Sequence, residues 1–113
     1  MRKKYKVVWS DVAETDLIGI IEFIADENSS TAKKILKKIK EKASNLFYMP
    51  EKGRIVPELL EQGIAEYHEL IVTPWRIIYK MENKRVLVFS VLDARRNIED
   101  ILLRRLIELR KLR

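Results

Sequence analysis

Three mainly apolar runs in the second half of the chain are dominated by β-branched and aromatic residues and separated by turn residues, a pattern that predicts consecutive β-strands. The runs cover Tyr67–Val72, Trp75–Met81 and Arg85–Leu92. Thr73-Pro74 ends the first run, and the polar pair Asn83-Lys84 predicts a two-residue hairpin turn before the third. We therefore expect these strands to form an antiparallel core around which the rest of the chain packs.

The first half of the chain has the 3.6-residue apolar spacing of amphipathic helices. A short strand at Lys4–Trp9 precedes Ser10, a candidate N-cap, and a helix that runs to about Asp26. A second helix is expected from about Thr31 to Phe47, and a last one from Asn97 to the C-terminus. The order β-α-α-β-β-β-α predicts an α+β fold in which a helical hairpin packs on an antiparallel sheet. We expect one domain, residues 1–113.

Arginines occur inside one of the apolar strands and directly after another. Arg76 lies inside the second strand, and Arg95-Arg96 follow the third. A two-residue turn at 83–84 would set Arg76 opposite Val91 and on the same face as Asp93. Arg76 is therefore either a buried ion-pair partner of Asp93 or a contact for a phosphate group, because a charge is rarely buried without a partner.

Composition narrows the function classes. The 113 residues include no cysteine and one histidine, which excludes disulfides, thiolate metal sites and histidine-rich metal sites, and we expect no cofactor. No apolar run is long enough for a membrane span or a signal peptide, so we expect a cytoplasmic protein. The net charge of +6 favours a polyanionic partner. The lysine run of the second helix is interpreted as a solvated helix face.

The segments GRIVPEL, YHELIV, WRIIYK and VFSVLDARRNIEDIL follow one another in an order that resembles the RelE/ParE superfamily. These proteins are the toxins of type II toxin–antitoxin modules, often described as plasmid stabilization proteins, and the resemblance covers about residues 5 to 107. It implies growth inhibition that a cognate antitoxin neutralises. It also implies that operator DNA is bound only through the antitoxin, and that no membrane is involved.

The superfamily divides by target, so the resemblance leaves the activity open. RelE-like members are mRNA endoribonucleases (mRNA interferases) that depend on the ribosome, and ParE-like members are described as poisons of DNA gyrase. The resemblance assigns conditional nuclease roles to Arg76, Arg95 or Arg96, and Glu58, and His68 has a suitable intrinsic pKa. The first core strand, however, has no lysine, and Asp93 stands where a histidine is common. These departures favour the ParE-like reading, in which the protein has no enzymatic activity of its own.

A third alternative for the function is a degenerate toxin that serves only as a binding or corepressor module.

Two further expectations concern the binding surfaces. The last helix has more apolar residues than one face needs, so we expect one side to pack on the sheet and the other to meet a partner. The residues expected to bind the target or the antitoxin are Lys52, Arg54, Arg76, Arg95, Arg96, Leu103 and Ile107.

Overall fold

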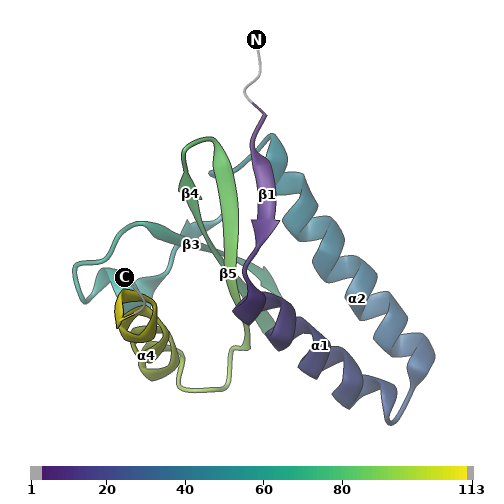
Figure 1. Ribbon diagram of the computed structural model, residues 1–113. Helices are drawn as coiled ribbons and strands as arrows, with labels where there is room; N and C mark the ends of the chain where they lie inside the picture. The colour runs from purple at the N-terminus through teal and green to yellow at the C-terminus, as the bar shows by residue number, and fades with distance from the viewer. Residues whose placement is uncertain (1–3, 112–113) are drawn as a thin grey trace.

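A computed structural model describes residues 4–111 and shows a five-stranded sheet with helices on both faces (Figure 1). The spatial order of the strands is β1-β5-β4-β3-β2. The elements in chain order are β1 (Lys6–Trp9), α1 (Asp11–Ala25), α2 (Ser29–Ser44), the 3-10 turn η1 (Asn45–Phe47), β2 (Arg54–Ile55), α3 (Pro57–Leu60), β3 (Tyr67–Val72), β4 (Trp75–Glu82), β5 (Arg85–Asp93) and α4 (Ile98–Lys111). The α+β class, the N-terminal helical hairpin and the C-terminal helix are confirmed.

Side-chain caps fix where the three long helices begin. The Ser10 hydroxyl accepts a hydrogen bond from the amide of Ala13, as the sequence predicted, and Asn28 caps α2 in the same way. Asn97 accepts a hydrogen bond from the amide of Asp100 at the start of α4. The second helix ends as an α-helix at Ser44 and finishes in η1. The expected continuation of the last helix to the chain end lies outside the described residues.

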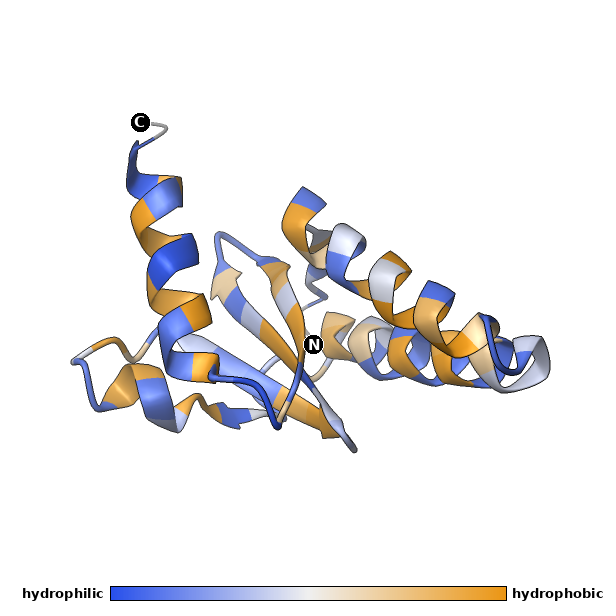
Figure 2. Cartoon of the chain, turned by 90° about the horizontal axis from the view of Figure 1, so that it is seen from below, coloured by the Kyte–Doolittle hydropathy of each residue, from blue (hydrophilic) through white to orange (hydrophobic). Residues whose placement is uncertain are grey.

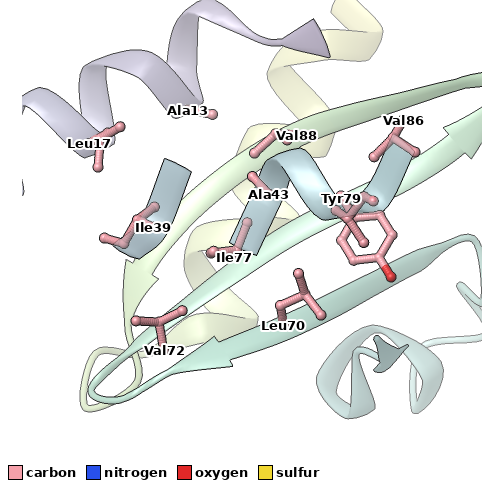
Figure 3. Close-up of a cluster of buried hydrophobic side chains, with 11 residues drawn as sticks. Ala13, Leu17, Ile39, Ala43, Leu70, Val72, Ile77, Tyr79, Val86 and Val88 are labelled. Atoms are coloured by element: carbon pink, nitrogen blue, oxygen red, sulfur yellow. The ribbon is translucent and has the colours of Figure 1, made fainter. Parts of the chain in front are cut away.

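The hairpin of α1 and α2 covers one face of the sheet. Ala13 and Leu17 of α1 and Ile39 and Ala43 of α2 are buried against the strands. Figure 3 shows these side chains clustered with Leu70, Val72, Ile77, Tyr79, Val86 and Val88 of the sheet. Burying a leucine or isoleucine side chain stabilises the fold by about 1.5–3 kcal/mol, so this cluster holds the hairpin on the sheet.

The opposite face of the sheet is covered by α3 and α4. Leu59 of α3 and Ile98 and Leu102 of α4 are buried with Ile78 of β4 and Phe89 of β5. Figure 2 shows α4 on one side of the sheet and the α1–α2 hairpin on the other. The sheet is therefore the middle layer of three, and both of its faces are core.

One strand pairing differs from the simple antiparallel expectation, and another confirms the predicted hairpin turn. The edge strand β1 pairs with β5 in parallel, because the two helices carry the chain back over the sheet before the meander begins. In the β4–β5 hairpin, Asn83 and Lys84 have φ of 49° and 61°, as a two-residue turn with the strand twist requires. The predicted pairing of Glu82 with Arg85 is confirmed.

The predicted pairing of Arg76 with Val91 is wrong by one residue. A β-bulge lies where Ile78 pairs with Ser90 and Tyr79 pairs with Val88, which leaves Phe89 as the extra residue. Beyond the bulge every partner shifts by one, so Arg76 pairs with Leu92. Because successive strand residues alternate in face, Val91 and Asp93 move to the face opposite Arg76.

Within residues 4–111, no helix is both long enough and apolar enough to span a bilayer.

Candidate functional site

Arg76 is the centre of a buried ionic network on the α3–α4 face of the sheet. Its Nε donates to Glu69 of β3 at 2.6 Å, and its two terminal nitrogens donate to both oxygens of Glu58 on α3 at 2.6 and 2.7 Å. The second oxygen of Glu69 accepts from Arg54 of β2 at 2.6 Å. The side chains of Glu69 and Arg76 are 0% and 7% exposed. The network therefore joins three strands and one helix.

The network balances two cations against two carboxylates, so its formal charge is zero. The hydrogen bonds that Arg76 donates to Glu58 lower the pKa of Glu58 and raise the pKa of Arg76. Both groups thus stay ionised at neutral pH. The expected pairing of Arg76 with Asp93 is wrong, because the bulge turns Asp93 to the other face and Glu58 and Glu69 take its place.

His68 lies on the opposite face of the sheet from Arg76. It pairs with Tyr79 across the strands, and the two rings stack with centroids 5.8 Å apart on the face covered by the hairpin. The Nδ1 atom of His68 is buried and has no hydrogen-bond partner among residues 4–111. The sheet therefore separates His68 from Glu58 and Arg76, the groups with which it would share a nuclease site.

Arg95 and Arg96 lie at the rim of a groove of about 730 Å³ between α1 and the ends of β4 and β5. Arg95 is bound to Asp93 through 2.6 and 2.9 Å hydrogen bonds, which lower the pKa of Asp93 to about 2. The groove wall includes Trp75 and the exposed Phe23. Asp93 pairs with Arg95 and leaves Arg96 unpaired, since Arg96 is exposed and makes no ion pair among the described residues.

The loop that carries Lys52 and Arg54 is held against the sheet by Tyr79. The tyrosine hydroxyl donates to the carbonyl of Pro50 at 2.8 Å and accepts from the amide of Gly53 at 2.9 Å. A Cβ at Gly53 would lie 2.4 Å from the carbonyl oxygen of Glu69, so this close approach requires glycine. Lys52 is exposed, whereas Arg54 belongs to the ionic network.

The last helix has a side that packs on the sheet and a side that is exposed. Leu103 is partly buried against the apolar cluster on the α3–α4 face of the sheet, whereas Ile107 is 55% exposed. Arg105 anchors the helix through hydrogen bonds of 2.7 and 2.9 Å to Asp16 of α1 and 2.8 Å to Ser90. A groove of about 310 Å³ lies beside it, lined by Val12, Phe89, Arg104, Arg105, Glu108 and Leu109.

Sequence reasoning missed Glu69, Asp16 and Arg105. Glu69 carried a usable signal, because it is a second charge within an apolar strand and has the opposite sign to Arg76. Asp16 and Arg105 are 89 residues apart and both lie on ordinary amphipathic helices, so no local pattern connects them.

Comparison with known proteins agrees with this architecture. Residues 7–98 match the model of the family described as ParE toxin of type II toxin-antitoxin system, parDE. A solved structure of the chromosomal ParDE TA system from P. aeruginosa has the same fold, with a TM-score of 0.67 and 16% identity, covering 80% of this chain and 97% of that one. No curated protein matches. Because the family match spans most of the chain, this protein belongs to the ParE toxin family of type II toxin–antitoxin systems.

Proposed function

We propose that this ParE-family protein inhibits growth by binding DNA gyrase, and that it has no nuclease site of its own. The observation that carries the proposal is the engagement of Arg76, whose three guanidinium nitrogens all donate to carboxylates. A guanidinium that stabilises a phosphate in a transition state must offer donors to that phosphate. Here three of its five N–H groups are already bonded to carboxylates, and the cation is neutralised by Glu58 and Glu69.

The spatial separation of the other candidates supports the same proposal. Metal-free RNA cleavage needs a base, a cation and an acid around one phosphate. His68 and Arg76 lie on opposite faces of the sheet, and Glu58 is hydrogen-bonded to the very cation it would have to assist. Arg95 and Arg96 lie on a different rim, at the α1 groove. These groups do not surround a common point.

Whether the target is DNA gyrase or the message on the ribosome is tested by adding the purified protein, freed from its antitoxin, to two reactions. One is coupled translation with the message followed by primer extension, and the other is DNA supercoiling by gyrase. We expect supercoiling to be lost while the message stays intact. Codon-dependent cleavage with normal supercoiling would replace the proposal with the RelE-like ribonuclease. An inactive protein in both reactions would support a degenerate, purely binding module.

We propose further that the cognate antitoxin covers the outer side of α4 and the groove beside it. Ile107 and Leu109 are 55% and 42% exposed, and Val12 is 41% exposed across the groove. An apolar strip beside a groove suits an amphipathic segment of a partner. The Ile107→Glu variant should therefore bind the antitoxin at least tenfold more weakly in calorimetry. Met49→Glu, which alters a side chain 50% exposed elsewhere, serves as the control, and equal losses in both variants would contradict the assignment.

A further inference from the structure

The six lysines on the outer side of α2, which we call the lysine face, hold most of the net charge of the protein. They are Lys33, Lys34, Lys37, Lys38, Lys40 and Lys42. Glu41 is the one acid of this helix, so α2 contributes +5 to a total of +6. The neighbouring α1 has four acids and no base. The charge of the hairpin is therefore strongly polarised, and a solvated face does not require such polarity.

The charges of the lysine face are not compensated within the described part of the chain. None of the six lysines forms an ion pair with residues 4–111, although eight ion pairs occur elsewhere in that range. Lys40 alone has a specific contact, with its Nζ 4.5 Å from the centroid of the Trp9 ring. Lys33 and Lys37, like Lys34 and Lys38, are like charges four residues apart, which destabilises a helix by about 0.2–0.5 kcal/mol per pair. This arrangement lowers helix stability, and an anionic partner would reverse that loss.

We propose that the lysine face of α2 binds duplex DNA through its phosphate backbone, without reading the base sequence. The inference does not depend on gyrase being the target, and it adds a DNA contact made by the toxin itself to any made by an antitoxin. Lysine suits this task because its ammonium group is a point charge on a flexible stem, which contacts phosphates without demanding a fixed geometry.

The rigidity of the charged helix favours a duplex. Lys33 and Lys42 are nine helical steps apart, about 14 Å along the axis, so six charges lie about 2–3 Å apart along the helix. Duplex DNA carries about one negative charge per 1.7 Å of its axis, and a single strand about one per 3.4 Å. The spacing lies between these two values, so the duplex is preferred because it is a rigid polyanion that needs no ordering when it meets a rigid helix. An acidic peptide segment would have to be ordered first, at a cost in conformational entropy.

The burial pattern of α2 argues against a membrane surface as the partner. Helices that bind membranes insert an apolar face next to their basic residues. In α2 the apolar residues Ala32, Ile39 and Ala43 are 3%, 0% and 1% exposed and face the core of the protein, and Leu36 alone of its large apolar side chains is exposed, at 36%. The lysine face therefore has only one exposed large apolar side chain of its own helix beside it, which is far less than a membrane-inserting face.

The test compares two variants that each lose four positive charges, from +6 to +2. One carries glutamine at Lys33, Lys34, Lys37 and Lys38, and the other at Lys6, Lys84, Arg85 and Arg110. All eight side chains are exposed, and none forms an ion pair within the described residues. Glutamine has nearly the helix propensity of lysine, which applies to the four positions in α2 and to Arg110 in α4. Lys6, Lys84 and Arg85 are exposed positions of two strands and a turn, and circular dichroism melting curves verify that both variants fold.

Binding is measured by fluorescence anisotropy on two labelled 20-base-pair duplexes of unrelated sequence, at several salt concentrations. We expect equal affinity for both duplexes. The Kd of the α2 variant should rise at least tenfold, and the slope of log K against log salt should become shallower by about 3–4, since each phosphate contact contributes about 0.9. The control variant should change Kd less than threefold. Equal losses in both variants, no binding by the wild type at 50 mM salt, or equal binding to anionic vesicles would overturn the proposal.

Discussion

Replacement of Arg76 by alanine should destabilise the fold severely, because it removes the cation on which two carboxylates depend. Glu69 is 0% exposed and would keep one partner, Arg54, whose own side chain is 63% exposed. Glu58 would lose both of the hydrogen bonds that attach α3 to β4. Removing one member of a buried ion pair costs about 3–5 kcal/mol, since the remaining charge is left in a desolvated site.

The loss is measured by urea denaturation at neutral pH, with thermal melting as a second observable. A change of 3–5 kcal/mol in a domain of this size lowers Tm by roughly 12–20 °C. Adding Glu69→Leu to Arg76→Ala should restore part of the loss, because it removes the uncompensated carboxylate. A single variant that melts like the wild type, or a double variant less stable than the single one, would refute the structural role given to Arg76.

Three further predictions follow from individual contacts. Arg76 lowers the pKa of Glu58 in the folded state. The Glu58 carboxylate therefore stabilises the fold above its unfolded pKa of about 4.3, and this stabilisation is lost as the pH falls. Glu58→Gln should therefore flatten the decline in urea midpoint between pH 5 and pH 3, and an unchanged decline would contradict this. Gly53→Ala should cost about 1–3 kcal/mol through overpacking against the β3 backbone, whereas Gly19→Ala, with open space around it, should gain about 0.5–1 kcal/mol in the same denaturation assay. Arg105→Gln should speed amide hydrogen exchange in α4 at least tenfold while the α2 amides are unchanged, and uniform acceleration would argue against a local anchor.

The helices and the hairpin turn of this fold can be predicted from short-range signals in the sequence. Ser10 caps its helix, and Asn83 with Lys84 makes its turn, because each depends on the chemistry of a few adjacent residues. The pairing of β1 with β5 depends on where two helices return the chain, and no local pattern specifies this.

The candidate site was less predictable, and the reason is one extra residue. The bulge at Phe89 shifts the partners of β4 by one and exchanges the faces of Val91 and Asp93. Counting residues from the turn cannot locate a bulge in a run in which Ser90 is the one polar residue among apolar neighbours, since both registers bury apolar side chains. The sequence predicts that Arg76 needs a partner, but the partners are Glu69 of the adjacent strand β3 and Glu58 of the short helix α3.

The central claim is that Arg76 serves the fold and not a reaction. The most direct measurement is growth inhibition by a variant in which Arg76→Met, Glu69→Leu and Glu58→Gln are combined, with folding verified by circular dichroism. Replacing buried ionic groups by groups of similar volume is often neutral for stability, and the remaining member of the network, Arg54, has a side chain that is 63% exposed. The account predicts that this variant folds and inhibits growth as the wild type does. A folded variant that no longer inhibits growth would contradict it, because the guanidinium would then act on the target itself.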